Sequence, residues 1–230
     1  MNKRIELEFS NKYDDSHARQ YLEKHRNGLW RRLSHQRDEQ LARKALRLAG
    51  DPGLVLDLPC GAGRFWPLLA EKPERLIIGA DNSADMLRTA RHAQPEDVVQ
   101  RVQPLQTSAF AIDLPDNAVD SIFCMRLLHH VGQAQHRAAL LREFHRVSRD
   151  SVIVSLWVDG NFKAWKRKRL ERKRNGSGTP QSGADGYQNR FVLPAATVEK
   201  EFEQAGFNIQ KRLDFLPMYA MWRVYLLRKQ

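Results

Sequence analysis

The sequence predicts a single α/β domain built on a doubly wound, mostly parallel β-sheet. Strand patterns and helical patterns alternate over residues 54–157, as they do where helices connect parallel strands. The first strand pattern ends in Asp57, and a loop with Gly61 and Gly63 separates it from the next helical pattern. A strand, a glycine loop and a helix start in this order are typical of a nucleotide site at the carboxyl end of the strand, although two glycines at such a place are also typical of a simple turn.

The other elements of the predicted core continue this alternation. Strands are expected over residues 54–58, 76–80, 98–105, 119–125 and 151–157, and helices over residues 62–71, 83–93 and 134–147. Asn82 or Ser83 is expected to cap the second helix, because both side chains accept hydrogen bonds from the first helical N–H groups. Residues 51–158 therefore form the predicted core of the domain.

Helical and hairpin segments flank this core. Residues 14–49 have an amphipathic helical pattern, so residues 1–50 are expected to form a helical cap. The apolar stripe of this helix comprises Trp30, Leu33, Leu41, Ala45 and Leu48. Residues 191–230 contain a helical pattern over 195–205 and strand patterns over 207–215 and 221–227. The short turn between these two strands requires them to be antiparallel.

The insertion before the C-terminal part, residues 159–190, carries most of the net charge. Residues 163–174 contain eight Lys or Arg residues and one acid, a net charge of +7 out of +11 for the whole chain. Phe162, Trp165 and Leu170 interrupt these charges at near-helical spacing. Gly, Ser and Pro predominate over residues 175–186, which predicts a flexible loop. A segment this basic favours polyanions such as RNA, anionic lipid head groups or phosphorylated sugars.

Composition excludes several classes of protein. The chain has 230 residues, of which 42% are hydrophobic, and this suits one well-packed domain rather than two. No segment has the pattern of a signal peptide or a membrane span, so we expect a cytoplasmic protein. Cys60 and Cys124 lie in apolar segments, and neither they nor the eight histidines have the spacing of metal ligands. We expect reduced thiols and no metal.

Further motifs follow the glycine loop in order. Asp81 ends the second strand pattern. A carboxylate at this place can accept hydrogen bonds from both hydroxyls of a ribose, or it can interact with the positive end of the dipole of the next helix. Residues 114–120 read L-P-D-N-A-V-D, and residues 127–131 read L-L-H-H-V. With D-L-P-C-G-A-G over residues 57–63, this set resembles the class I, Rossmann-like S-adenosylmethionine-dependent methyltransferases, in particular the small bacterial ones.

The resemblance covers about residues 54–157 in sequence, and the C-terminal helix and hairpin in topology. It implies a seven-stranded sheet of order 3-2-1-4-5-7-6 with the seventh strand antiparallel. It also implies an enzyme that transfers the methyl group of S-adenosylmethionine.

The same resemblance implies which residues bind this cofactor. Asp57, Gly61 and Gly63 would surround its methionine part. Asp81 would bind the ribose, with Asn82 at the ribose edge. The other implied contacts are Met86, Ser108, Ala109 and Phe110 around the adenine, and Arg126 near the sulfonium.

Some positions depart from the family pattern or match it only thinly. Pro59 stands where the loop often has its first glycine, so an N–H is lost and φ is restricted. Ser108 stands where the family often has an Asp. Its hydroxyl can accept a hydrogen bond from the adenine amino group, but this bond should be weaker because a neutral hydroxyl gives no charge assistance. Residues 149–151 replace a Gly-Gly and should alter only a surface turn. Tyr13 and Tyr21 fit a pattern of helices that fold over the cofactor, although helix packing explains them equally well.

Two adjacent histidines are the candidate general bases. Methyl transfer from a sulfonium mainly requires the reacting atoms to be held in line, and a base is needed only where the acceptor starts protonated. His129 is the first candidate and His130 the second, because both follow the fourth strand pattern and imidazole titrates near neutral pH. Packing, or a place at a helix start, explains either histidine equally well.

Three functions are open from the sequence. The first is methyl transfer to an anionic acceptor: a phosphorylated or acidic small molecule, a glycan or a lipid. The second is methylation of RNA through the basic segment, although no recognisable RNA-binding module is present. The third is a catalytically silent adaptor that binds the cofactor. The basic segment also fits a peripheral contact with the anionic inner face of a membrane, a lid over the site, or a merely solvated helix.

Overall fold

A computed structural model describes residues 29–175 and 190–230 of the chain. Its strands are β1 (Leu54–Asp57), β2 (Leu76–Asp81), β3 (Val102–Gln106), β4 (Val119–Cys124), β5 (Ser148–Trp157), β6 (Phe207–Asp214) and β7 (Trp222–Lys229). Its helices are α2 (Leu29–Leu48), α3 (Trp66–Leu69), α4 (Ala84–Ala93), α5 (Glu96–Val99), the 3₁₀ helix η2 (Leu128–His130), α6 (Ala134–Val147), α7 (Phe162–Asn175) and α8 (Ala195–Gln204). Tyr13, Tyr21 and most of the predicted flexible loop lie outside the described residues.

The described strands form one sheet in the order β3-β2-β1-β4-β5-β7-β6. Strands β1 to β5 pair in parallel, whereas β7 is antiparallel to both of its neighbours, β5 and β6. This is the predicted strand order, and the antiparallel C-terminal hairpin is confirmed. Because β7 runs the other way, its first residue, Trp222, pairs with Trp157, the last residue of β5.

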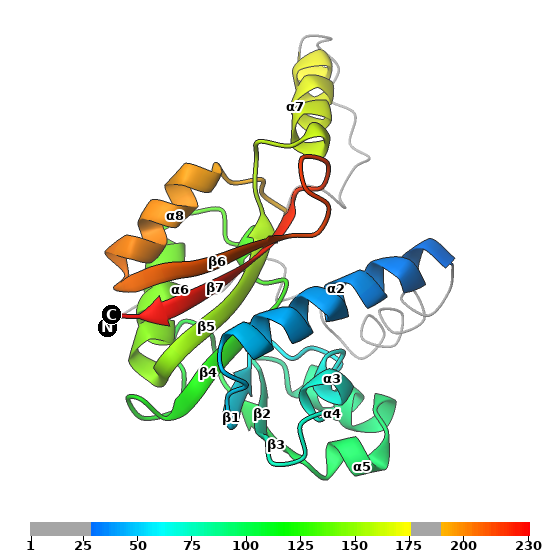
Figure 1. Ribbon diagram of the computed structural model, residues 1–230, viewed down its shortest axis with the longest axis vertical. Coiled ribbons are helices and arrows are strands. Elements are labelled where there is room, and N and C mark those ends of the chain that lie inside the picture. The colour runs from blue at the N-terminus through cyan, green and yellow to red at the C-terminus, as the bar shows by residue number, and fades with distance from the viewer. Residues whose placement is uncertain (1–28, 176–189) are drawn as a thin grey trace.

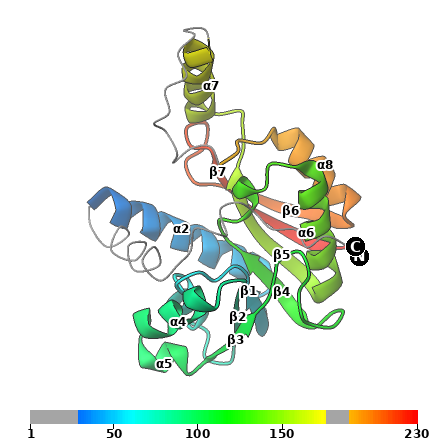
Figure 2. The same cartoon turned by 180° about the vertical axis from the view of Figure 1, so that it is seen from behind.

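Helices cover both faces of the sheet (Figures 1 and 2). The helices α2, α3 and α4 lie on one face, and α6 and α8 lie on the other. Neighbouring strand residues divide between the two layers: Ile122 belongs to the cluster with α6 and α8, and Phe123 to the cluster with α2, α3 and α4. Burial on both faces explains why the central strands contain runs of consecutive apolar residues, such as residues 122–124 of β4 and 152–154 of β5.

Several predicted boundaries are corrected. The helix expected over 62–71 is only the short α3, because the chain turns through residues 61–65 before it. The strand expected over 98–105 begins at Val102, because Pro95 precedes a short helix, α5. The fifth strand begins at Ser148 rather than residue 151, because Ser148 already pairs with Val119 of β4.

The cap helix packs on the sheet through only part of its length. Leu41 and Ala45 of α2 are buried against the α3 and α4 layer, as predicted. Leu33 and Leu48 are instead 47% and 38% exposed, so the predicted stripe is wrong at these two positions. The covered section lies between them, because α2 crosses the sheet obliquely and its first turns extend beyond it (Figure 1).

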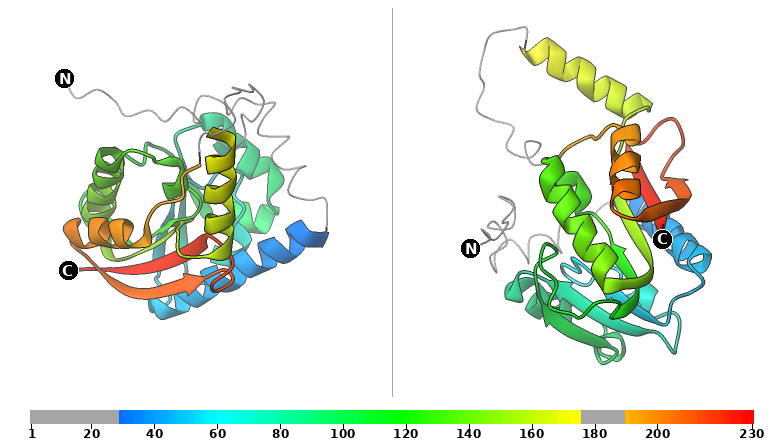
Figure 3. Two further views of the ribbon diagram at one scale, coloured as in Figure 1. Left: turned by 90° about the horizontal axis from the view of Figure 1, so that it is seen from above. Right: turned by 90° about the vertical axis from the view of Figure 1, so that its left-hand side faces the viewer.

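The basic segment forms α7, which stands clear of the sheet and its helical layers (Figure 3). It follows β5 in the chain. Within residues 29–175 and 190–230, every helix is too short or too polar to span a bilayer.

Candidate functional site

One edge of the sheet gathers the ends of several strands. β1, β2, β4 and β5 end at this edge, and β7 begins there. The loops that leave β1, β2 and β4 carry most of the predicted site residues. In doubly wound sheets ligands bind outside the carboxyl ends of the strands. We call this side of the molecule the carboxyl edge.

The loop after β1 follows a path that requires glycine at two positions. Gly61 and Gly63 have φ values of 54° and 70°, in the left-handed region that glycine adopts without strain. A Cβ atom on Gly63 would also lie 2.8 Å from the Trp66 indole. The peptide bond before Pro59 is cis. Further along, a 3.0 Å hydrogen bond from Gly63 N to the Cys60 carbonyl closes the loop. The two glycines therefore let the loop take this path, with Gly63 packed against the Trp66 indole.

Asp81, at the end of β2, ties the glycine loop to the next helix. Its Oδ2 accepts a hydrogen bond from Gly61 N and its Oδ1 accepts one from Ser83 N, both at 3.0 Å. Ser83 in turn caps α4 by accepting a bond from Met86 N, as predicted. Burial raises the pKa of Asp81, and the backbone donors partly offset this rise. The carboxylate supports the start of α4 and keeps acceptor capacity for a ligand hydroxyl.

Asp57, at the end of β1, is 1% exposed and has no cationic partner close enough to form an ion pair among the described residues. Burial raises its pKa well above the ordinary value, and the negative charge of Asp81 raises it further. The nearby indole N–H of Trp66 offsets part of this rise in the pKa of Asp57. The two groups do not, however, meet the geometry of a hydrogen bond. Asp57 Oδ2 and Trp66 Nε1 thus remain buried and unpaired within the described chain. Such atoms are rare, and the Asp57 carboxylate beside the glycine loop marks a place where a ligand donor can supply the partner.

The predicted adenine contacts lie beside the same loop. A Cβ atom on Gly61 would be 3.5 Å from Met86 Cε, so Met86 borders the loop. The segment 107–110 is held next to the end of β2 by a 3.0 Å hydrogen bond from Thr107 N to the Asp81 carbonyl. In this segment Ser108 Oγ accepts a hydrogen bond from Phe110 N at 3.2 Å, while Ala109 and Phe110 are half-buried. Asn82 is exposed.

An ion cluster that the sequence did not indicate joins α2 to two site loops. Asp38 of α2 is buried and accepts hydrogen bonds from Arg64 Nη2 at 2.8 Å and from Arg126 Nη2. Arg64 follows the glycine loop, and Arg126 follows β4 with φ 69°, which is uncommon outside glycine. Asp38 Oδ1 and Arg126 Nε are buried without partners among the described residues. The sequence did contain one sign of this cluster: Asp38 lies three residues before Leu41, so a charged side chain falls on the apolar stripe of the helix.

His129 lies between two tryptophans. Its ring stacks on Trp157 at 5.1 Å between centroids and meets Trp222 edge-on at 5.1 Å. We call these three residues the aromatic cluster. Burial lowers the pKa of His129 well below its usual value, and the charges of neighbouring basic groups lower it further. The imidazole is therefore neutral at neutral pH. His129 Nδ1 and Trp222 Nε1 are buried with no hydrogen-bond partner in the described part of the chain.

Three guanidinium groups surround the aromatic cluster. Arg126 lies over Trp222 at 5.0 Å, and Arg167 and Arg190 lie over Trp157 at 5.6 and 5.8 Å. They come from the loop after β4, from α7 and from the segment before α8. Of these three, only Arg126 was a predicted site residue. Arg167 and Arg190 lie far along the chain from the site motifs, and no sequence spacing connects them to the site. These three guanidinium groups concentrate positive charge on the α7 side of the carboxyl edge.

The remaining reactive side chains occupy secondary places. The ring of His130 is 4.1 Å from that of His129 and is half-buried. Cys60 and Cys124 are buried and form no disulfide. Burial raises the pKa of both thiols well above the ordinary value, and nearby aspartates raise it further. Both cysteines therefore act as small apolar side chains, as predicted.

The sheet order and the position of the site define a class of protein. This strand order with an antiparallel β7 is the fold of the class I, Rossmann-like methyltransferases. A solved structure described as magnesium protoporphyrin IX methyltransferase (ChlM) from Synechocystis PCC 6803 with bound SAH aligns with a TM-score of 0.69. It is 19% identical and the alignment covers 89% of each chain, so the likeness concerns the fold.

Sequence comparison agrees with this class. Residues 55–151 match the model of a methyltransferase-domain family. The chain is 33% identical over 113 residues to a trans-aconitate 2-methyltransferase from Azoarcus sp. (strain BH72), which is 49% of this chain and 41% of that protein. It is 25% identical over 128 residues to the tRNA (carboxymethyluridine(34)-5-O)-methyltransferase ALKBH8 from Macaca fascicularis, which is 54% of this chain and 18% of that protein.

The matches thus span less than half the length of these curated relatives. The family match over residues 55–151 and the fold confirm the resemblance to the class I, Rossmann-like S-adenosylmethionine-dependent methyltransferases that the motifs indicated.

Proposed function

We propose that the protein is an active methyltransferase that transfers the methyl group of S-adenosylmethionine to a carboxylate oxygen of an acidic acceptor. This narrows the anionic acceptor expected from the sequence, which included phosphorylated or acidic small molecules, glycans and lipids. The observation that carries the proposal is the gathering of Arg126, Arg167 and Arg190 around the aromatic cluster.

The loops after β1 and β2 fit the cofactor of this family. The unpaired Oδ2 of Asp57 and the remaining lone pairs of Asp81 can accept hydrogen bonds from ammonium or hydroxyl donors. Gly61 and Gly63 let the loop take the left-handed turns that place its backbone beside Asp81. S-Adenosylmethionine supplies a methyl group activated on a sulfonium, and the part of the chain is to hold the acceptor in line with it. The other predicted contacts, Tyr13 and Tyr21 included, remain predictions.

The α7 side of the carboxyl edge has the groups that recognise a carboxylate. Guanidinium groups bind carboxylates through paired, charge-assisted hydrogen bonds. Arg126 Nε and Trp222 Nε1 are buried donors without partners among the described residues, so an acidic acceptor could satisfy both. The rings of Trp157 and Trp222 offer an apolar surface to the rest of the acceptor.

The names of two relatives support the same class of acceptor. Trans-aconitate is a carboxylic acid, and carboxymethyluridine carries a carboxymethyl group. Because the matched segments span less than half of those proteins, the names support a class of acceptor and no single compound.

A carboxylate acceptor also determines the role of His129. Such an acceptor is already deprotonated at neutral pH and needs no general base. His129 would then position the acceptor through its packing on Trp157. For a hydroxyl or ammonium acceptor, the neutral His129 would be the base, with His130 second. His129→Asn should therefore lower kcat less than about tenfold with a carboxylate, against about 100- to 10,000-fold for loss of a base.

The deciding experiment is incubation of the full chain with methyl-labelled S-adenosylmethionine and trans-aconitate, beside other di- and tricarboxylic acids. A methylated carboxylate is an ester, and mild base releases its label as methanol, whereas methyl ethers and N-methyl groups survive. Asp81→Asn controls for dependence on the cofactor site. Label that survives base treatment, or no transfer to any of these acids, would contradict the proposal.

RNA is a second candidate acceptor, because α7 is strongly basic and one relative is named as a tRNA methyltransferase. Label transferred to bulk RNA and to none of the acids would support this alternative. The adaptor function predicts a third result: calorimetric binding of S-adenosylhomocysteine with no label transferred to acids or RNA.

A further inference from the structure

Exposed apolar side chains gather where the start of α7 meets the turn between β6 and β7. Ten large apolar side chains are exposed among the described residues, and six of them come from these two segments. Five lie close to the junction: Phe162, Trp165, Leu216, Met218 and Tyr219. We call these five residues the docking surface. Single exposed apolar residues are ordinary, but a contiguous group of this size marks an interaction site.

Backbone hydrogen bonds join the two segments of the docking surface. Phe162 N donates to the Met218 carbonyl at 2.9 Å, and Lys163 N donates to the Tyr219 carbonyl at 3.0 Å. The Phe162 ring stacks on Tyr219 and also contacts Trp165, with 5.8 Å between centroids in each pair. The first N–H groups of α7, which lack partners within the helix, are satisfied here. The surface is therefore a fixed part of the fold.

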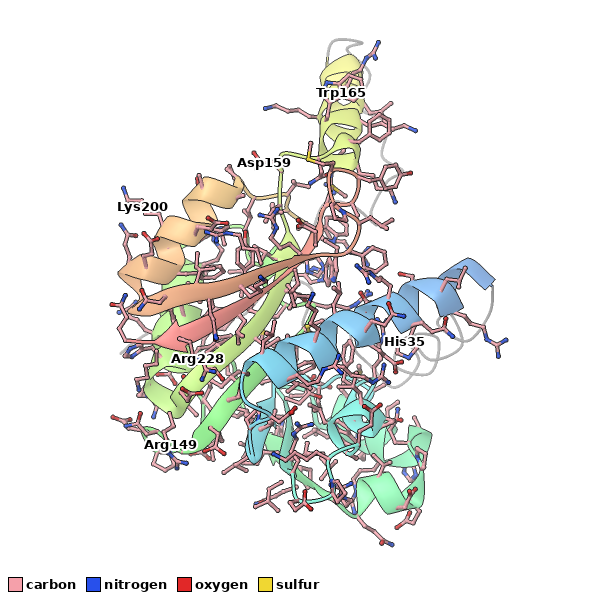
Figure 4. All side chains as sticks on the ribbon, viewed as in Figure 1. His35, Arg149, Asp159, Trp165, Lys200 and Arg228 are labelled. Atoms are coloured by element: carbon pink, nitrogen blue, oxygen red, sulfur yellow. The ribbon has the colours of Figure 1, made fainter. Side chains whose placement is uncertain are left out.

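Basic residues border the docking surface along α7. Within its first two turns the helix carries Lys163, Lys166, Arg167, Lys168 and Arg169. Lys163 Nζ lies 5.2 Å from the Tyr219 ring, and the Arg169 guanidinium lies 5.5 Å from the Trp165 ring. Apolar and positive groups thus occur on the same side of the molecule. Trp165 lies on α7 away from the sheet, where a large flat partner can reach it (Figure 4).

We propose that the docking surface and the basic residues of α7 bind the protein to the surface of an anionic lipid bilayer. The apolar and aromatic side chains would enter the head-group region, where tryptophan and tyrosine are the preferred anchors of membrane proteins. The lysines and arginines would be attracted by the negative surface potential of anionic lipids. The helix need not cross the bilayer.

Lipid suits this surface better than RNA does. Leu216 and Met218 offer no ring on which a base can stack, yet they gain free energy by leaving water. A face of each ring is already engaged: Phe162 and Tyr219 are stacked with 12° between their planes, and Arg169 covers one face of Trp165. Single-stranded nucleic acids are bound through aromatic faces that are open to their bases.

The docking surface lies next to the proposed acceptor site. Arg167 of the same helix lies over Trp157, and Trp222 follows Tyr219 by three residues. A docked protein would therefore hold its carboxyl edge close to the bilayer. Membrane binding is nevertheless independent of the identity of the acceptor, so either proposal can fail alone.

The test is co-sedimentation of the full chain with vesicles of phosphatidylcholine mixed with phosphatidylglycerol, compared with phosphatidylcholine alone and with bulk RNA, each over a salt series. We expect binding to the anionic vesicles that weakens as salt screens the charges. Met218→Asn should reduce this affinity about tenfold through lost apolar contact. Asparagine suits the positive φ of 59° at this position. Lys168→Glu should reduce the affinity at least about fivefold.

Two matched variants control for general effects of composition. Leu76→Thr removes a 65% exposed apolar side chain at the start of β2, on the opposite edge of the sheet. Lys200→Glu reverses an exposed charge on α8 (Figure 4). Both variants should bind vesicles like the wild-type chain.

Three outcomes would overturn the proposal. One is no binding to anionic vesicles at low salt. Another is a loss for Met218→Asn no larger than that for Leu76→Thr. The third is retention by RNA in place of vesicles, which would assign the basic helix to nucleic acid. Calorimetric binding of S-adenosylhomocysteine by each variant verifies that it is folded.

Discussion

The two sides of the carboxyl edge are built in different ways. On the β1–β2 side, the polar groups come from a short continuous stretch of chain and are fixed by backbone hydrogen bonds, such as those that Asp81 accepts from Gly61 and Ser83. On the α7 side, Arg126 and Trp222 come from distant parts of the chain and meet through ring contacts. A site fixed by local backbone leaves a motif in the sequence, whereas a site assembled from separate elements does not.

The two sides also differ in charge. The β1–β2 side holds two buried carboxylates, Asp57 and Asp81, whose pKa values are both raised by burial. The α7 side holds guanidinium groups around the aromatic cluster. One side can therefore accept hydrogen bonds from hydroxyl or ammonium donors, and the other can bind an anion. Substitutions on each side should affect different ligands.

The largest effect is expected from Asp81→Asn, which should break the β1–β2 side. Loss of the charged acceptor should weaken binding of S-adenosylhomocysteine about 100-fold or more, since each hydrogen bond to a charged group contributes about 1.5–3 kcal/mol. Isothermal titration calorimetry measures this affinity. Asp85→Asn, on the first turn of the same helix α4, should bind normally. Normal binding by Asp81→Asn would show that Asp81 only supports the loop and the helix start.

Arg126→Gln should separate the two sides. We expect kcat/KM for the acidic acceptor to fall about 10- to 100-fold, because a charge-assisted contact is lost, while affinity for S-adenosylhomocysteine changes little. Steady-state kinetics and calorimetry measure the two effects. Arg88→Gln, an exposed position on α4, is the matched control. An equal loss of cofactor affinity would place Arg126 on the cofactor side, as the family resemblance implies.

Asp57→Asn should stabilise the ligand-free protein while weakening cofactor binding. A carboxyl group with a raised folded pKa contributes most stability below its unfolded pKa, near 3.8, and loses that contribution as the pH rises through the folded value. Removing this buried charge should raise the free energy of unfolding at neutral pH by about 1–2 kcal/mol. Urea denaturation at several pH values measures it.

The difference between Asp57→Asn and the wild-type chain should shrink as the pH falls toward 3.8. A difference that stays constant with pH would show that the Asp57 charge is not its cause. Lower stability of the variant at neutral pH would contradict the prediction outright.

The smallest effect is expected from Ser83→Ala. Loss of the N-cap should cost about 1 kcal/mol of stability, with cofactor affinity nearly unchanged, because Asp81 still accepts the backbone N–H at this position. Urea denaturation and calorimetry provide the two measurements. Thr89→Ala, in the middle of α4, should leave stability nearly unchanged. A loss of affinity for Ser83→Ala would make the start of α4 part of the ligand contact.

Local patterns predicted the fold but not all of its boundaries. The helix predicted over residues 62–71 is only the short α3, because Gly61 and Gly63 adopt positive φ values and the chain continues as a turn up to residue 65. Leu33 and Leu48 fit the helical stripe of α2, yet both are exposed, because a periodic pattern does not say how much of a helix another layer covers. Asp38 shows the converse: an acid on the buried stripe is satisfied by Arg64 and Arg126 from other elements.

The sequence by itself determined the class of fold, the antiparallel hairpin and the chain of motifs from Asp57 to Asp81, because these depend on periodicity, turn length and nearby backbone contacts. Only the tertiary structure decided that Arg167 and Arg190 reach Trp157, and that the start of α7 joins the turn at Met218. Contacts between distant segments depend on how whole elements pack, and no local spacing encodes them.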